Sequence, residues 1–119
     1  MKVEGLRELI VRADAADKAT KRMVREGLRD AVEPVREDAA SRLEAYDVRS
    51  SRNYRVVVRR TGLVAVEQRL RRTTGKRPDF ATLQKRKALY PAAEAQRPEV
   101  LSRMEREVEK VGRVFEGRF

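Results

Sequence analysis

The strongest constraint on the fold is a run of six apolar residues that recur every three or four positions in the first half of the chain. They are Val24, Leu28, Val32, Val35, Ala39 and Leu43. This spacing places all six on one face of a helix and leaves the charged residues between them on the opposite face. Because Pro34 lies inside the run and has no backbone N–H to donate, we expect a kink near residues 30–34.

Two further helices are expected, one before this run and one near the end of the chain. The apolar side of the first is Val3, Leu6, Leu9 and Ile10. Either Asp14 or Asp17 is suited to cap the start of the long helix. Pro91 suits the first position of the last helix. The apolar side of this last helix is Val100, Met104, Val108, Val111 and Phe115.

The middle of the chain changes from helical to strand periodicity. β-branched and aromatic residues dominate 54–59, a turn is expected at 60–62, and a second strand is expected at 63–67. The inward face of the first strand is formed by Tyr54, Val56 and Val58. Since an isolated hairpin is only marginally stable in water, it must pack on the helices or pair with a neighbour.

These elements predict a single α+β domain over residues 1–119. The N-terminal helices, with the long one kinked near Pro34, and the C-terminal helix pack on a small antiparallel β-sheet, and a basic loop connects the sheet to the last helix. The expected segments are a helical part at 1–47, a β-hairpin at 48–70, a basic loop or arm at 71–90 and a C-terminal helix at 91–117.

Positive charge is concentrated in the middle of the chain. The whole chain has 29 Lys and Arg against 19 Asp and Glu, a net charge of +10. Residues 48–87 contain only Glu67 and Asp79 as acids, whereas the flanking segments are close to neutral. The candidate interface or DNA-facing basic residues are Arg59, Arg60, Arg69, Arg71, Arg72, Lys76, Arg77, Lys85, Arg86 and Lys87. Such a cluster binds phosphates without sequence preference, or pairs with acids on a neighbouring subunit, and both interpretations stay open.

Residues 71–87 are expected to form an arm that is mobile in the free subunit and ordered on assembly. The segment contains Gly75 and Pro78 and has too few apolar residues to offset the entropy of ordering. Its candidate anchors are Phe80, Leu83 and Leu89. Because an arm that faces only phosphates has no need of apolar anchors, the pattern favours a clasp on a neighbouring protein over a lining for a DNA channel.

The residue types on which catalysis and metal binding most often depend are missing. The chain has no Cys and no His, which removes thiolate chemistry, the usual general base and the commonest metal ligand. Gly75-Lys76 does not continue into a phosphate-binding loop, since Leu70 stands where the first glycine is required and Arg77 where Ser or Thr is required. The chain has no bilayer-spanning apolar run and no signal-peptide pattern. We therefore predict a soluble, cytoplasmically made protein that is not an enzyme, has no cofactor or metal, and has no membrane partner.

The small apolar content and the hairpin together favour self-association. Aromatic residues make up only 5% of the chain and Trp is absent, so the core is aliphatic and small. A two-stranded hairpin also leaves strand edges unpaired. Packing between copies of the chain remedies both shortages, and we expect a homo-oligomer.

Several short motifs resemble the minor tail-component, or tail-completion, family of long-tailed phages of the lambda-like type. VEGLREL at 3–9 is similar to the start of these proteins, and AVEPVR at 31–36 to their alanine-rich helix with a central proline. TTGKRPDF at 73–80 and ALYPA at 88–92 resemble the version found in actinobacterial phages and prophages. One departure is RSSR at 49–52, where many members carry a Thr–Gly–x–Leu step.

The resemblance implies a structural virion protein. Such proteins form rings, commonly of six copies, that complete or terminate the tail and join it to the head connector, with DNA passing through. The implied partners are further copies of the chain, head-closure or connector proteins and the tail tube protein, with non-specific contact to DNA in the channel. The implied location is the head–tail junction (neck) of the virion. The alternative is a small basic protein that binds nucleic acid without sequence preference.

Overall fold

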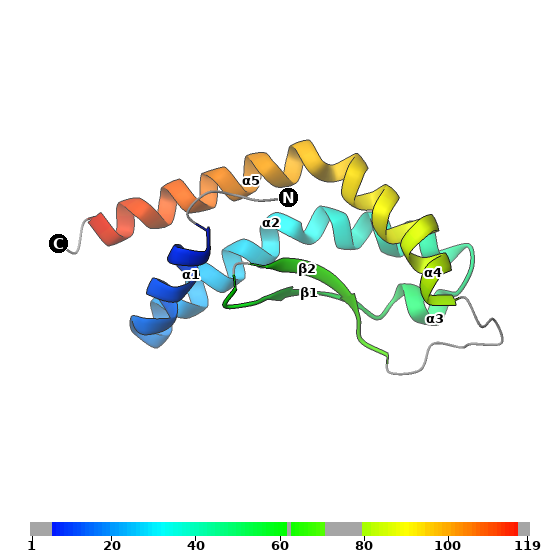
Figure 1. Cartoon of the computed structure of the whole chain (residues 1–119), viewed down its shortest axis with the longest axis horizontal. Helices are drawn as coiled ribbons and strands as arrows, with labels where there is room; N and C mark the ends of the chain where they lie inside the picture. Colours follow the sequence, from blue (N-terminus) through cyan, green and yellow to red (C-terminus); the bar gives the residue numbers. More distant parts are fainter. Residues whose placement is uncertain (1–5, 62, 71–79, 117–119) are drawn as a thin grey trace.

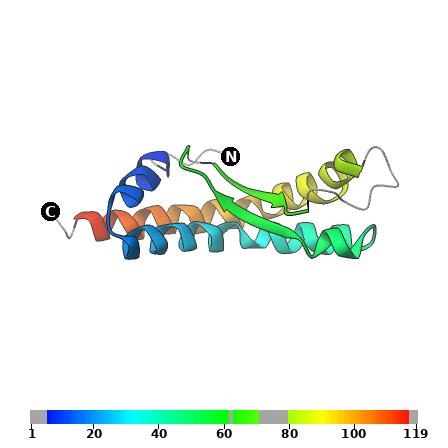
Figure 2. The same ribbon diagram turned by 90° about the horizontal axis from the view of Figure 1, so that it is seen from below.

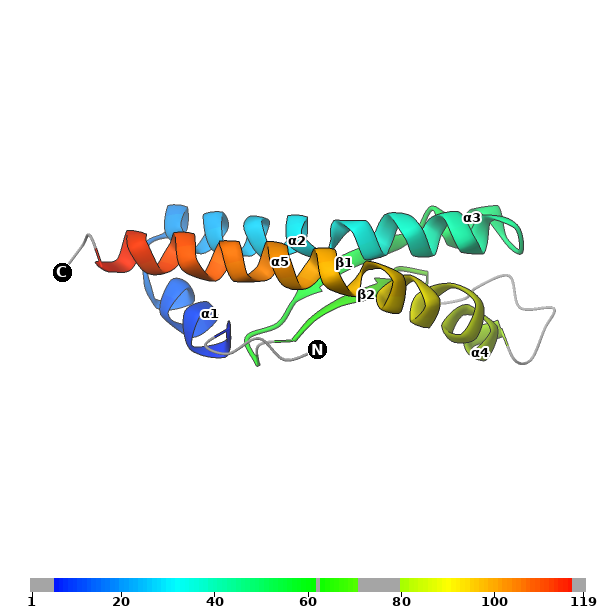
Figure 3. The ribbon, with the colours of Figure 1, turned by 90° about the horizontal axis from the view of Figure 1, so that it is seen from above.

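The computed structural model describes residues 6–61, 63–70 and 80–116 of the chain. In chain order the elements are the helices α1 (Leu6–Ala15), α2 (Lys18–Glu44) and α3 (Val48–Ser51), the strands β1 (Tyr54–Val58) and β2 (Val64–Gln68), the helix α4 (Phe80–Gln84), the π-helical turn η1 (Lys85–Leu89) and the helix α5 (Tyr90–Glu116). Figures 1 and 3 show α2 and α5 side by side and antiparallel along the longest axis, which extends 56 Å. The predicted α+β fold with a small antiparallel sheet is confirmed.

The predicted apolar face of α2 forms the centre of the core. All six of its residues are buried, and Leu28 and Leu43 have no exposed surface. Asp17, one of the two candidate caps, starts the helix, because its carboxylate accepts a hydrogen bond from the backbone N–H of Thr20 at 2.7 Å. The helix continues unbroken through Pro34, and Figure 1 shows its axis curving over the hairpin.

The hairpin packs its predicted inward face against the helices. β1 and β2 pair antiparallel, with Val56 opposite Val66 and Val58 opposite Val64. Tyr54 and Val58 are buried, and Val56, Val64 and Val66 are half-buried against the core. Figure 2 shows the two strands lying across the pair of long helices, so that the sheet closes one side of the core.

Two parts of the predicted segmentation are wrong. Residues 48–51, assigned to the hairpin, form the short helix α3, whose start is fixed by Asp47; its carboxylate accepts a hydrogen bond from Ser50 Oγ at 2.6 Å. Residues 80–89, assigned to the basic loop or arm, are helical as α4 and η1 and continue directly into α5. The rest of the predicted arm, residues 71–79, lies outside the described residues.

The helical segment before α5 buries a polar and a small residue as well as leucines. Gln84 and Ala88 are buried, while Leu83 and Leu89 are half-buried against the core. The wide π turn ends directly before the first turn of α5, which contains Pro91. Because Pro91 has no N–H to donate to the preceding turn and its ring needs space there, a widened turn at this point relieves the clash.

Helix α5 packs along α2 through the predicted apolar positions. Val100, Met104 and Val111 are buried, and Val108 is half-buried. The side chain of Phe115 lies outside the described residues. The C-terminal helix therefore completes the core that α2 begins.

Candidate functional site

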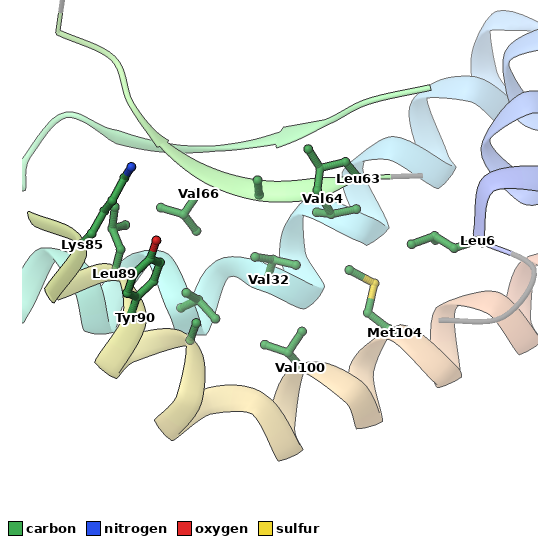
Figure 4. A pocket seen from close by; sticks show the side chains of 13 residues that line it. Leu6, Val32, Leu63, Val64, Val66, Lys85, Leu89, Tyr90, Val100 and Met104 are labelled. Carbon is green, nitrogen blue, oxygen red and sulfur yellow. The ribbon is translucent and has the colours of Figure 1, made fainter. Parts of the chain in front are cut away.

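An apolar groove opens between strand β2 and the helices, with a volume of about 430 Å³. Its walls are built by the side chains of Val32, Val64, Val66, Val100 and Met104, with Leu6 at one end. Figure 4 shows these side chains converging from β2, α2 and α5. The groove exists because β2 covers the gap between the two long helices with short valines, which leave space that larger residues would fill.

The rim of the groove carries exposed apolar side chains. Leu63 is 52% exposed and Tyr90 is 62% exposed, and both line the groove. The positively charged side chain of Lys85 lies on the same rim, as Figure 4 shows. Within the described sheet, β2 pairs only with β1, so its second edge has no strand partner. An open groove with apolar residues on its rim is the feature expected of a docking surface rather than of a closed core.

A buried polar network fixes α4 on the hairpin. The phenol of Tyr54 donates a hydrogen bond to Gln84 Oε1 at 2.9 Å, and Gln68 Nε2 donates to the same oxygen at 3.1 Å. Gln68 Nε2 also donates to the backbone oxygen of Ser50 at 3.0 Å. Burial raises the pKa of Tyr54 to about 12. This network places η1, and with it Lys85, at the end of the groove.

A second polar contact joins α1, α2 and β1. The guanidinium of Arg25 donates to both carboxylate oxygens of Asp14, at 3.0 and 2.7 Å, and to the backbone oxygen of Val58 at 2.6 Å. These hydrogen bonds lower the pKa of Asp14. Asp14 therefore does not cap α2 but ties α1 to it, which holds Leu6 at the end of the groove.

The predicted basic residues do not form one patch. Arg59, Arg60 and Arg69 are exposed on the hairpin, and Lys85, Arg86 and Lys87 are exposed on η1. Figure 1 shows that the β1–β2 turn lies at one end of the hairpin and that η1 lies beyond the other end. The structure thus divides the described basic residues between the two ends of the sheet, with Arg59 and Arg60 at the β1–β2 turn and Arg69 at the other end, nearer to the cations of η1. Arg71, Arg72, Lys76 and Arg77 lie outside the described residues.

Among the described candidate cations, only Arg59 forms an ion pair. Arg59 forms an ion pair with Glu67 at 2.5 Å, and Arg55 lies 3.9 Å from the same carboxylate. Among the described residues, no carboxylate lies within ion-pair distance of the remaining five cations. These five are Arg60, Arg69, Lys85, Arg86 and Lys87. Their charge is available to an external anion or to acids on another molecule.

The predicted arm anchors pack within the chain instead of standing free. Leu83 and Leu89 contact the protein's own core, and Leu89 also lines the groove. The side chain of Phe80 lies outside the described residues. For Leu83 and Leu89 the prediction of anchors on a flexible arm is wrong, because the segment that carries them is helical.

The structure also identifies residues that sequence reasoning missed. No periodic pattern in the sequence marked the groove or its rim residue Tyr90. The hydrogen-bond network around Gln84 was also missed, because it joins positions up to 34 residues apart in the chain, from Ser50 to Gln84. One usable signal was present in Gln84 itself, a polar residue on the same helical face as Ala88. It would be expected to need a buried partner if the segment were helical.

The described residues contain no group of three or more acidic, His or Cys side chains that could hold a metal ion. In the part of the chain that the structure covers, no helix is long and apolar enough to cross a membrane. Comparison of the chain with protein-family models, curated proteins and solved structures gives no match.

Proposed function

We propose that this protein is a structural virion component that forms a ring, of six copies, at the head–tail junction of a phage. The ring completes or terminates the tail and joins it to the head connector, and DNA passes through it. The resemblance of the motifs at 3–9, 31–36, 73–80 and 88–92 to the tail-completion family supports this role. The observation that carries it is the apolar groove beside β2, whose second edge has no strand partner within the described sheet.

Two features of the groove support the proposal that this protein assembles with copies of itself. Exposed apolar side chains such as Leu63 and Tyr90 cost solubility unless they are covered, and a neighbouring subunit covers them. An unpaired strand edge is likewise a ready site for addition of a further strand. When such contacts run head to tail between identical copies and the rotation closes, the product is a ring.

The proposal is tested by measuring assembly with and without DNA. The purified protein is studied by native mass spectrometry and by electron microscopy of negatively stained samples, over a range of concentrations. Closed rings that form in the absence of DNA are the expected result. Imaging of assembled particles that shows this chain as a single isolated copy would contradict the proposal.

The alternative is a small protein that binds nucleic acid without sequence preference, and one observation favours it. Of the described candidate basic residues, all except Arg59 are exposed and have no described carboxylate within ion-pair distance. A monomer or dimer that binds duplex DNA, with an affinity that falls steeply as salt is raised, would favour this function over the ring.

A further inference from the structure

The exposed large apolar residues of the described chain gather in two separate places. Leu63 and Tyr90 lie on the rim of the groove, whereas Tyr46 is 48% exposed and Val48 is 45% exposed at the junction of α2 and α3. We call residues 44–48 the corner. Figures 2 and 3 show that the turn between α2 and α3 lies at one end of the molecule, on the flank of α2 away from α4 and α5. One molecule therefore presents exposed apolar side chains at the corner and, in a different place, an apolar groove that could receive them.

The corner is held rigidly. The backbone N–H groups of Tyr46 and Asp47 donate to the oxygen of Leu43 at 2.8 and 2.9 Å. The carboxylate of Asp47 then accepts hydrogen bonds from the N–H of Arg49 at 3.2 Å and from Ser50 Oγ at 2.6 Å. Because the backbone on both sides of Tyr46 is fixed, binding costs the conformational freedom of its side chain but not that of the chain around it.

One pair of opposite charges links the two surfaces. The corner carries the exposed carboxylate of Glu44, and the rim of the groove carries the exposed ammonium of Lys85. Neither group has an ion-pair partner among the described residues. The groove volume of about 430 Å³ falls within the range of about 300–1,000 Å³ that is usual for ligand pockets, which is room for one or two side chains.

We infer that the groove of one copy receives the corner of a second copy, with Tyr46 and Val48 in the groove and Glu44 beside Lys85. This inference rests on the proposed function, since it names the contact through which the ring forms. The contact is heterologous: each copy uses its corner toward one neighbour and its groove toward the other. The tests below distinguish this corner–groove contact from a contact between two grooves and from a contact between the groove and a different protein.

The first test mixes two variants, each of which disables one half of the contact. Tyr46→Glu replaces the aromatic side chain of the corner and leaves the groove unaltered. Leu63→Glu places a charge on the rim of the groove and leaves the corner unaltered. Both positions are half-exposed, so both variants are expected to fold, and circular dichroism checks this. Each variant alone is expected to self-associate at least about tenfold more weakly than the unaltered protein, because the charge enters an apolar contact. Their mixture is expected to form dimers and nothing larger.

The second test uses the absence of cysteine from the chain, which makes any introduced thiol unique. Tyr46→Cys and Leu63→Cys are mixed and treated with a short bis-maleimide. We expect cross-linked heterodimers several-fold in excess of the homodimers that either variant gives alone. The matched control pairs Leu63→Cys with Ser102→Cys, an exposed position on α5 away from the corner, and is expected to give only background cross-linking.

The results separate this inference from the proposed function. If the unaltered protein forms rings, but both glutamate variants also form them and cross-linking shows no preference, the corner–groove contact is wrong and the ring stands. If corner and groove cross-link but the unaltered protein forms only open chains or dimers, the contact stands and the ring is wrong. Loss of association in Leu63→Glu alone, with Tyr46→Glu unaffected, overturns the inference in favour of a groove-to-groove dimer. Background cross-linking together with a monomer at every concentration also overturns it.

Discussion

Gln84 Oε1 accepts the side-chain hydrogen bonds that join α4 to the hairpin, and replacing Gln84 measures what they contribute to stability. Gln84→Leu keeps the volume of the side chain close to that of glutamine but removes the acceptor for the phenol of Tyr54. Tyr54 is 4% exposed, so its hydroxyl is left buried and without a partner. Gln68 Nε2 keeps its hydrogen bond to the backbone oxygen of Ser50. The expected loss in the free energy of unfolding is therefore that of one unsatisfied buried hydroxyl, about 1–3 kcal/mol.

The reciprocal variant should cost less. In Tyr54→Phe, Gln84 Oε1 still accepts a hydrogen bond from Gln68 at 3.1 Å, so no buried acceptor is orphaned. We expect a loss of about 0.5–1.5 kcal/mol. The double variant removes both partners and should cost less than the sum of the single variants. Urea denaturation followed by circular dichroism measures all three, with Lys87→Leu, on the exposed side of η1, as the control.

Alkaline pH gives an independent check on the same network. The folded-state pKa of Tyr54 is raised to about 12 from its ordinary value of 10.0, because burial disfavours the charged phenolate. The stabilisation by this group is therefore complete below pH 10 and is lost as the pH rises toward 12, a loss of roughly 3 kcal/mol. Tyr54→Phe should lack this loss. Additive costs, equal costs for the two single variants, or identical alkaline profiles would refute the account.

Three further predictions concern the rest of the fold and its charges. Asp14→Asn should reduce stability near neutral pH and flatten the acid side of the stability curve in urea titrations, because the lowered pKa of Asp14 makes its contribution present above the ordinary value of 3.8 and lost as the pH falls below it. Val56→Asp and Val108→Asp should unfold or severely destabilise the domain, since a charge placed against the core costs several kcal/mol of a total of about 5–15 kcal/mol, whereas Val57→Asp, on the other face of β1, should melt closer to the unaltered protein. Replacing Arg60, Lys85, Arg86 and Lys87 by Ser should make any duplex-DNA binding less sensitive to salt, by about 0.9 in slope for each phosphate that the protein no longer neutralises, while leaving the circular-dichroism melt unchanged.

Periodicity predicted the long elements of this fold well. The apolar positions of α2 step through five turns of helix, and an error at any one of them would not have changed the period. The strand β1 was equally clear, because Tyr54, Val56 and Val58 alternate with outward-facing residues. In each case, the residues that carry the pattern are the residues that the core buries, so the local pattern and the tertiary structure agree.

Periodicity failed where the buried side of an element is not apolar. In α4 and η1, the buried positions are Gln84 and Ala88, and three consecutive cations at 85–87 obscure the helical pattern. The stabilising partner of Gln84 is Tyr54 on the hairpin, which no local window contains. The four residues of α3 are too few to show a helical period, and only the capping carboxylate of Asp47 marks them.

Because residues 80–89 are helical rather than part of a loop, the positive charge at the candidate site has a different setting from the predicted one. The cations at 85–87 lie on an ordered helical turn fixed to the hairpin by Gln84, not on a segment that becomes ordered only on assembly. Folding has already ordered this turn, so a partner that pairs with Lys85 gains the charge interaction without that entropic cost. Apolar side chains adjoin Lys85 along the groove, and a phosphate backbone has no surface to cover them. A protein partner that offers both an apolar side chain and a carboxylate uses the whole surface, and the corner of a second copy offers both.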